Sequence, residues 1–446
     1  MKFFILCSFL LSLNLFAQGD LTIVAVGDAE QEKQAFVVAD PEYIGSLKGE
    51  QKALAIEITE LIRNDFSFYR HVFQVFDYDK SFGDPYQSAN YAKWKGKNYS
   101  YVVGTQVTAN GSNITYSIKA FNVLKGEELY SQSVLISARD VRSEGHKLAN
   151  GIYHAILGKE SIFTTKIYFV SDLPTVDRDK QMIKELYMMD FDGRNVERLT
   201  FHQGYVISPA VSPDQSRVVY SYVPNTKIKA KRNVNLFEMD LTTRRSKLIS
   251  EKPGLNSGAT FSSDGKRILL TLSMGENSDI YEMDLSNGAL RRITTHYSDD
   301  VDPSLNQAGD LMSFLSGRSG RAMIYTMDPT ATEKNVKRIS FVGRFNATPR
   351  FSPDGKEIVF SSWVDNRFDI YKIGSNGQDL VRMTKNFGSN EEPGFSKDGE
   401  FIIFTSQRVL SAKKAIQNVY IMNKEGEILG QLTRDFGNCS SPRWTN

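Results

Sequence analysis

The chain has 446 residues, 41% of them hydrophobic and 24% charged, a composition typical of globular proteins with more than one domain. Its formal net charge of +2 gives no basis for nucleic acid or an anionic membrane as the main partner. The 28 Phe and 20 Tyr favour β-rich structure over helical bundles.

Residues 1–17 have the features of a cleaved secretory signal peptide. Lys2 precedes an apolar run from Phe3 to Phe16, and small Ala17 marks the expected cleavage site. This run is too short to span a bilayer comfortably, and no second apolar segment of about 20 residues follows. We therefore expect an exported, soluble protein without direct membrane insertion. Cys439 is the only cysteine after the signal peptide, which excludes an intrachain disulfide.

Residues 18–160 mix strand and helix patterns and predict a small α/β domain. Apolar runs from Leu21 and from Gln34 are typical of strands. Helical spacing of apolar residues predicts one helix from Gly49 and a second from Ser143, ending at Gly158. Between them a β-hairpin is expected, with its turn at Asn110-Gly111.

Residues 161–446 consist of a repeated unit of roughly 44–50 residues, the length of a four-stranded propeller blade. The stretch FSPDGKEIVFSS recurs in related form, starting at Val211, Phe261, Leu305, Phe351 and Phe395. An IYxMD-like element follows in each unit, starting at Leu186, Leu236, Ile280, Ile324, Ile370 and Val419. Since one unit cannot bury both faces of its sheet, these six elements predict a mainly β fold, a six-bladed β-propeller.

The two ends of the repeat region predict how the ring closes. The stretch KIYFVSD from Lys166 resembles the second strand of a blade, with no first strand before it. The chain ends in SSPRWTN from Ser440, which resembles a first strand with no blade after it. We therefore expect the C-terminal strand to complete the first blade.

Candidate chemistry is scarce. Asp214, Asp264, Asp354 and Asp398 each occupy the third position of a S-x-D-x turn, where the carboxylate binds local backbone N–H groups. No G-x-S-x-G nucleophile elbow, HExxH metal motif or phosphate-binding loop occurs, so no catalytic residue, metal ligand or cofactor is predicted. An exported hydrolase or lyase, and a ligand-binding sensor, stay open as alternatives. The basic stretch Lys227–Arg232 is interpreted as a solvated hairpin tip or as a contact for an anionic surface.

The order of signal peptide, α/β domain and six blades resembles the TolB family of the periplasmic Tol–Pal system. The stretch YVVGTQVT from Tyr101, the F-S-P-D-G-K turns and the IYxMD elements carry this resemblance over essentially the whole mature chain. It implies a periplasmic, non-enzymatic scaffold, expected to be monomeric alone. Its implied partners are a Pal-like outer-membrane lipoprotein at the propeller mouth and a TolA-like inner-membrane protein at the N-terminal region. Such a scaffold supports outer-membrane integrity and constriction at division.

The resemblance also implies partner-binding residues. At the propeller mouth, just before each inner strand, these are Tyr205, Asn256, Asp300, Asp302, Arg344, Asn346, Glu391, Glu392 and Ser440. In the N-terminal segment they are Asp20, Leu21, Thr22, Ile23 and Val24. The carboxylates among the mouth residues, together with Asp299, are expected to converge, with either a partner-binding role or plain solvation.

Overall fold

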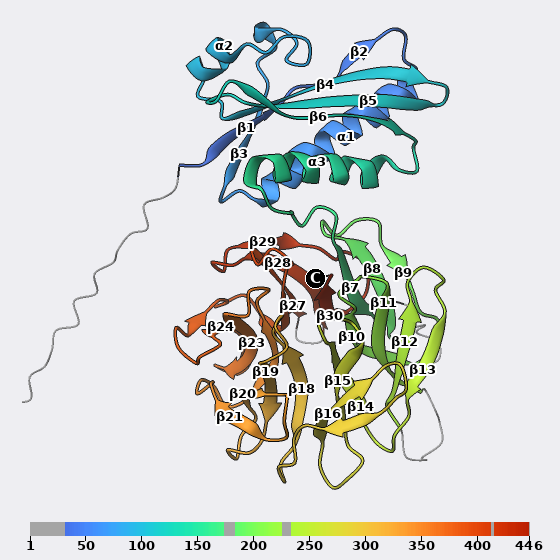
Figure 1. Cartoon of the computed structure of the whole chain (residues 1–446), viewed down its shortest axis with the longest axis vertical. Coiled ribbons are helices and arrows are strands. Elements are labelled where there is room, and N and C mark those ends of the chain that lie inside the picture. Colours follow the sequence, from blue (N-terminus) through green and yellow to red (C-terminus); the bar gives the residue numbers. More distant parts are fainter. Residues whose placement is uncertain (1–31, 174–182, 225–232, 412–413, 446) are drawn as a thin grey trace, which may run out of the picture.

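The computed structural model describes residues 32–173, 183–224, 233–411 and 414–445. An α/β domain packs against a six-bladed β-propeller, which confirms the predicted fold class (Figure 1). The signal peptide, the segment Asp20–Val24 and the basic stretch Lys227–Arg232 lie outside the described residues. None of the helices in the described ranges combines the length and apolar character needed to cross a membrane.

The α/β domain is one sheet covered by two long helices. The sheet runs in the order β3-β1-β4-β5-β6, with β2 paired to β4, and α1 and α3 lie between this sheet and the propeller (Figure 1). Its elements are β1 (Gln34–Val38), β2 (Glu42–Ile44), α1 (Gly49–Phe68), β3 (Phe73–Asp77), a 3₁₀ turn η1 (Lys80–Phe82), α2 (Tyr91–Gly96), β4 (Tyr101–Asn110), β5 (Asn113–Asn122), β6 (Glu127–Ile136) and α3 (Val141–Leu157). Both expected long helices are present.

The apolar faces of α1 and α3 form the domain core. Ile58, Ile62 and Phe66 of α1 and Ile152 of α3 have no exposed surface. Helix α3 ends at Gly158, whose φ of 71° is the left-handed C-cap expected of a glycine. The β4–β5 turn is shifted by one residue from the prediction, because Asn110 pairs with Asn113 and leaves Gly111-Ser112 as the two-residue loop.

Each propeller blade is a four-stranded antiparallel sheet, and in the second to sixth blades the strands run in chain order from the inner to the outer edge. The second to fourth blades are β10 (Tyr205–Val211), β11 (Arg217–Val223), β12 (Asn235–Asp240) and β13 (Ser246–Ser250); β14 (Asn256–Phe261), β15 (Arg267–Leu272), β16 (Asp279–Asp284) and β17 (Leu290–Arg292); β18 (Asp300–Leu305), β19 (Met312–Ser316), β20 (Met323–Asp328) and β21 (Lys334–Arg338). The fifth and sixth are β22 (Asn346–Phe351), β23 (Glu357–Val364), β24 (Arg367–Gly374) and β25 (Val381–Arg382); β26 (Ser389–Phe395), β27 (Phe401–Ser411), β28 (Lys414–Asn423) and β29 (Ile428–Gln431).

The first blade joins the two ends of the repeat region, as predicted. Its order is β30 (Cys439–Trp444), β7 (Lys166–Ser171), β8 (Glu185–Asp190) and β9 (Glu197–Arg198). Strand β30 pairs antiparallel with β7, and the Thr445 N–H donates to the Lys166 carbonyl at 3.0 Å. Because closure joins residues at opposite ends of the propeller sequence, the ring has no open edge between its first and last blades.

The repeated aspartate is a turn residue. In the four S-x-D-x turns the Ser hydroxyl donates to the carboxylate of the Asp two residues later: Ser212 to Asp214, Ser262 to Asp264, Ser352 to Asp354, and Ser396 to Asp398. The hydrogen bond from Ser352 holds the pKa of Asp354 below its usual value. These turns lie at the end of the propeller next to the α/β domain, which we call the proximal end. The loops that lead from each outer strand to the next inner strand lie at the opposite end, the distal face.

Every inner strand contains one β-bulge. In each, the third or fourth residue of the strand takes a left-handed conformation, with φ between 50° and 61°: Ser208, Gly258, Asp302, Thr348, Glu392 and Ser441. The strand register shifts at each of these points. A bulge frees a backbone N–H from its own sheet. The Asp302 and Glu392 N–H groups donate to Thr271 Oγ1 and Ser361 Oγ of the preceding blades, each at 3.1 Å, so bulges link neighbouring blades.

Candidate partner-binding site

The sequence pattern predicted that the mouth residues lie just before the inner strands. In the structure most of them lie within these strands. Asn256, Asp300 and Asn346 have no exposed surface. Their strands begin at these residues, and their side chains are buried.

The buried asparagines organise the loops that lead into their strands. Asn256 donates to the carbonyls of Val234 and Lys252 at 2.9 and 2.7 Å. Asn346 accepts from Ser340 Oγ and donates to the Val342 carbonyl at 3.0 Å and to Ser362 Oγ at 2.9 Å. A buried amide that satisfies loop carbonyls in this way fixes the loop geometry.

The predicted mouth carboxylates do not form one cluster. Asp300 Oδ2 accepts from Arg318 at 2.6 Å within its own blade, whereas Asp302 accepts from Arg350 of the next blade at 2.8 Å. Glu392 accepts from the Ser441 hydroxyl at 2.8 Å. Burial, and then the charge of Glu392, raise the pKa of Glu391 to about 7.

The remaining predicted residues differ in their exposure. Arg344 is exposed on the distal face, while Tyr205 and Ser440 are half-buried. Arg344 is thus the predicted mouth residue that is most available to a partner.

Exposed aromatic side chains are the most distinctive feature of the distal face. Phe201, Tyr297 and Phe341 are 69%, 83% and 73% exposed, and Phe345 is 41% exposed. All four lie in loops between an outer strand and the next inner strand. The guanidinium carbon of Arg198 lies 4.4 Å from the Phe201 ring centroid, and Arg338 repeats this geometry with Phe341 at 4.4 Å. A guanidinium at this distance attracts the face of each of these two rings.

The sequence contained a signal for these aromatics. Each blade closes with an element such as ERLT or KRIS, after which a polar turn is expected. Phe201 directly follows ERLT, and Phe341 directly follows KRIS. In both cases the aromatic residue comes three residues after an arginine. An apolar residue at a position where the chain must turn in solvent indicates a contact surface.

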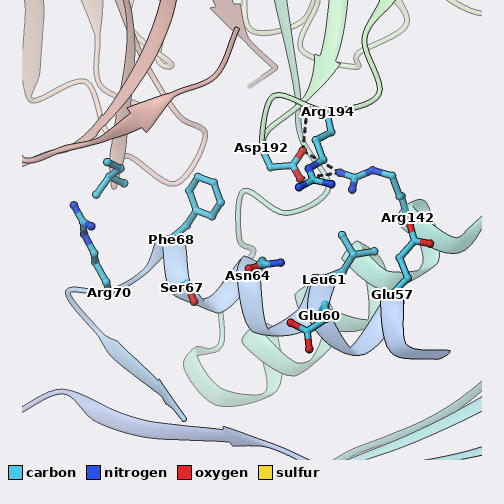
Figure 2. Close-up of a pocket in the computed structure, with 11 residues that line it drawn as sticks. Glu57, Glu60, Leu61, Asn64, Ser67, Phe68, Arg70, Arg142, Asp192 and Arg194 are labelled. Atoms are coloured by element: carbon cyan, nitrogen blue, oxygen red, sulfur yellow. Dashed lines mark hydrogen bonds and ion pairs between the residues drawn. The ribbon is translucent and has the colours of Figure 1, made fainter. Parts of the chain in front are cut away.

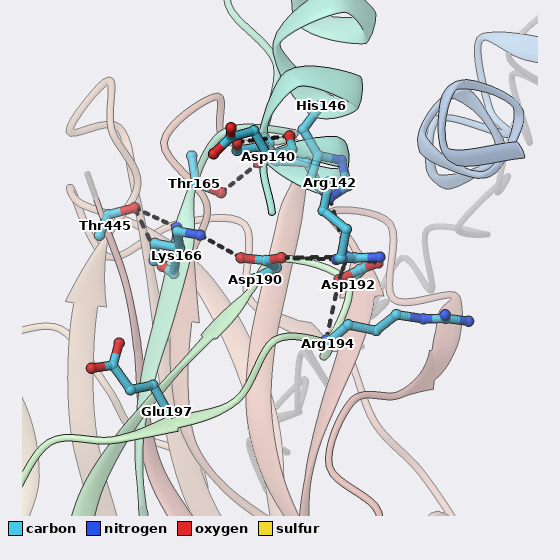
Figure 3. Close-up of polar contacts among 12 residues, drawn as sticks. Asp140, Arg142, His146, Thr165, Lys166, Asp190, Asp192, Arg194, Glu197 and Thr445 are labelled. Atoms are coloured by element: carbon cyan, nitrogen blue, oxygen red, sulfur yellow. Dashed lines mark hydrogen bonds and ion pairs between the residues drawn. The ribbon is translucent and has the colours of Figure 1, made fainter. Parts of the chain in front are cut away.

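A second candidate surface is the seam between the domains, where an ion network joins α3 and the first blade (Figure 3). Arg142 of α3 donates to Asp190 Oδ2 at 3.3 Å and to Asp192 Oδ2 at 2.8 Å. Lys166 also pairs with Asp190. These contacts fix one end of α3 to the turn that follows β8.

His146 extends this network into the α/β domain. Its Nε2 lies 3.2 Å from Arg142 Nη2, and its Nδ1 lies 2.8 Å from Asp65 Oδ2. Because a guanidinium can only donate, Nε2 is the acceptor, and the proton on Nδ1 is donated to Asp65. Burial raises the pKa of Asp65 to about 6, against the opposing effect of the His146 hydrogen bond.

The His146, Asp190 and Asp192 ligand atoms lie within 4.8 Å of one another, close enough to suggest a metal centre. However, the guanidinium of Arg142 contacts all three residues, and the ammonium of Lys166 contacts Asp190. Two cationic groups already neutralise the two carboxylates. The cluster is therefore better suited to joining the domains than to binding a cation.

A groove of ≈ 370 Å³ runs beside this network (Figure 2). One wall is α1 with Leu61 and Phe68, and the opposite wall carries Arg142, Asp192 and Arg194 (Figure 2). This seam groove combines apolar surface with charges of both signs.

Comparisons with known proteins agree with this geometry. Residues 153–362 match the TolB beta propeller domain. The chain is 30% identical over 367 residues to the Tol-Pal system protein TolB of Francisella tularensis subsp. mediasiatica strain FSC147, covering 79% of this chain and 80% of that protein. The same values hold for the protein of that name from Francisella tularensis subsp. holarctica strain OSU18.

Among solved structures, the crystal structure of TolB from Acinetobacter baumannii has the same fold. Its TM-score is 0.74 at 22% sequence identity, covering 93% of this chain and 97% of that chain. Fold and sequence together place the protein: the chain belongs to the TolB family, whose curated members are components of the Tol-Pal system.

Proposed function

We propose that the protein is a periplasmic scaffold that binds a Pal-like outer-membrane lipoprotein on the distal face of its propeller. Its N-terminal segment, residues Asp20–Val24, binds a TolA-like inner-membrane protein. By joining these partners the scaffold supports outer-membrane integrity and constriction at division. The signal peptide predicted at residues 1–17 supports export to the periplasm.

The observation that carries the first half of this proposal is the exposure of Phe201, Tyr297 and Phe341 on one face. Removing apolar surface from water is favourable by about 25 cal/mol per Å². Large exposed aromatic side chains therefore favour burial against a partner. Aromatic residues and arginines are also the side chains that contribute most to binding at protein interfaces. The distal face supplies both, since Arg198 and Arg338 stack beneath two of these rings.

The four turn aspartates support a binding role over catalysis. Each is held by its own turn serine, and the turns belong to separate blades. Asp354 also accepts from the backbone N–H of Lys356 at 3.1 Å. A carboxylate engaged in this way serves the local turn, so these residues offer no acid–base pair to a hydrolase or lyase.

The test is recovery of the lipoprotein by the mature protein from envelope extracts, followed by titration with the purified Pal-like protein. Phe341→Ala is expected to weaken binding at least tenfold while leaving the unfolding midpoint unchanged. Leu124→Ala is the matched control, because Leu124 is 82% exposed in the β5–β6 turn of the other domain. Failure to recover the lipoprotein, or equal binding by the two variants, would contradict the distal site.

The N-terminal half of the proposal has a separate test. Deletion of residues 20–24 from the mature protein is expected to abolish binding to a TolA-like protein and to leave binding of the lipoprotein unchanged. Unaltered TolA affinity in the deletion variant would rule out this segment as the contact.

A further inference from the structure

The channel of the propeller contains two arginines at one level near the proximal end. The position two residues after each bulge lines a cavity of ≈ 410 Å³, and its six members are Ala210, Thr260, Ser304, Arg350, Gly394 and Arg443. Four of the six side chains are small or absent. The two arginines belong to the fifth and first blades, so they flank the sixth blade, which contributes Gly394.

Open space lies at Gly394, between the two arginines. A Cβ atom placed on this glycine would meet no atom within 4 Å apart from its immediate chain neighbours. Gly394 is not in the left-handed region, so the backbone itself does not require glycine there. The absent side chain therefore leaves a floor between two guanidinium groups.

The two guanidinium groups are not equally satisfied. Arg350 donates to Asp302 Oδ1 at 2.8 Å and to the Pro349 carbonyl at 2.6 Å. Among the described residues, Arg443 has one hydrogen bond, to the Pro442 carbonyl at 2.8 Å, and no carboxylate within 4.0 Å. A guanidinium carries five N–H donors, so most of those on Arg443 are open to the cavity.

The charge of the neighbouring Glu392 offsets this only in part. Glu392, one blade before Arg443, accepts from the Ser441 N–H and hydroxyl at 2.5 and 2.8 Å and from Thr405 Oγ1 at 2.9 Å. Its oxygens are thus committed to the bulge and to its own blade. Burial, and then the positive charge of Arg350, lower the pKa of Arg443 to about 10. A bound anion would offset the repulsion between Arg350 and Arg443.

We propose that Arg443, Arg350 and the open floor at Gly394 form a binding site for the carboxylate group of a small organic acid. A guanidinium fork matches the planar geometry of a carboxylate. Among the described residues that line the cavity, Lys397 is a third cationic side chain and none is Asp or Glu, so the cavity attracts an anion, and selection of a carboxylate rests on the planar guanidinium fork. The cavity volume is within the range of about 300–1,000 Å³ common for small-ligand pockets.

The test uses acetate as the probe, titrated into the mature protein by calorimetry at constant ionic strength, with sulfate as the competing anion. Saturable acetate binding is expected for the native protein. Arg443→Gln is expected to lower the acetate affinity at least tenfold, and Arg443→Lys, which keeps the charge but loses the fork, by a smaller factor. Arg245→Gln removes an exposed arginine from the second blade and is expected to bind acetate as the native protein does.

A second variant separates a lost site from a lost fold. Gly394→Val fills the floor while both arginines remain, and it is expected to abolish acetate binding with the propeller intact by circular dichroism. Acetate binding that is unchanged in Arg443→Gln or Gly394→Val would overturn the proposal. Sulfate binding equal to that of acetate would also overturn it, because a general anion site does not select a carboxylate.

Discussion

The Tyr69 hydroxyl donates a 2.5 Å hydrogen bond to Oδ2 of Asp398, joining the end of helix α1 to a turn of the sixth blade. The same hydroxyl accepts from the Ile162 N–H at 3.0 Å. The other oxygen of Asp398 accepts from Ser396, as in the equivalent turns of the repeat. One carboxylate thus serves the blade with Oδ1 and the domain seam with Oδ2.

Tyr69→Phe tests the value of this contact. Burial raises the pKa of Tyr69 well above its usual value, so the native hydroxyl keeps its proton and donates at all physiological pH values. Removing it leaves the Asp398 carboxylate and the Ile162 N–H without this partner. We expect the free energy of unfolding in urea to fall by about 1–3 kcal/mol.

The repeat provides a matched control for the same contact. Asp398→Asn and Asp354→Asn alter equivalent turns, but only the former also removes a contact with the α/β domain. Asp398→Asn should therefore be the more destabilising change. Tyr69→Phe should lower the free energy of unfolding by less in the Asp398→Asn variant than in the native protein. If the stability losses of the two single variants add up to that of the double variant within about 0.5 kcal/mol, direct coupling between Tyr69 and Asp398 is contradicted.

Arg142→Ala tests the ion network of the seam. It leaves the buried Asp190 and the half-buried Asp192 without their shared guanidinium. The loss of stability should be below the roughly 3–5 kcal/mol of a fully buried pair, because the Arg142 side chain is 20% exposed. Faster proteolysis of the linker after α3 should accompany it, since α3 loses its tie to the first blade.

Arg194→Ala is the control for Arg142→Ala. Arg194 lines the same seam groove and is exposed, and its side chain forms no ion pair with the described residues. Its removal should change stability by no more than about 0.5 kcal/mol. Equal losses in the two variants would mean that general electrostatics, rather than the network, holds the seam.

The sequence predicted the propeller well because its information is periodic. Six copies of one pattern indicate the same blade six times, and the unmatched ends at Lys166 and Ser440 indicate how the ring closes. Contacts between domains have no such redundancy. Tyr69 and Asp398 are 329 residues apart and occur once, so no local pattern identifies the pair.

The candidate site was harder to predict for a related reason. A bulge and a buried amide are defined by the neighbouring strand, which local periodicity does not describe. Asn256 and Asn346 were therefore expected as partner-binding residues, and the sequence did not show that their buried amides organise the loops of the distal face. Phe341, by contrast, could be identified from the sequence, because an apolar side chain at a turn indicates a contact surface.

Glu400 gives a prediction for the pH dependence of stability. The His71 imidazole, with the ammonium groups of Lys424 and Lys159, lowers the pKa of Glu400 to about 2, against the opposing effect of burial. A carboxyl group with a lowered pKa in the folded state contributes stability above its unfolded pKa, and this contribution is lost as the pH falls. The loss should occur between about pH 4.5 and pH 2 and reach at most about 3 kcal/mol.

Urea unfolding of Glu400→Gln between pH 2 and pH 6 measures this contribution. The variant should be less stable than the native protein at pH 6 and should converge with it near pH 2. Glu425→Gln, an exposed neighbour on the same blade, should keep the native pH profile. A constant difference between Glu400→Gln and the native protein over the whole range would contradict the pKa shift.

Asn346 and Arg344 separate structural from partner-binding roles at the distal face. Asn346→Ala leaves the Ser340 hydroxyl, the Val342 carbonyl and the Ser362 hydroxyl without their buried amide. We expect a loss of about 1–3 kcal/mol in the free energy of unfolding. Arg344→Ala, which truncates an exposed side chain between Phe341 and Phe345, should change stability by less than about 0.5 kcal/mol.

For binding of the partner the order of the two variants should be reversed, with Arg344→Ala the more strongly affected. Titration with the Pal-like lipoprotein should show weaker binding for Arg344→Ala, because Arg344 is exposed in the loop that carries Phe341 and Phe345. Asn346→Ala should lose affinity only to the extent that its loop becomes disordered, so added osmolyte that restores its folding should also restore its binding. If Arg344→Ala binds normally and stabilised Asn346→Ala does not, the partner contacts the start of β22 itself, and the loop aromatics are not the main contact.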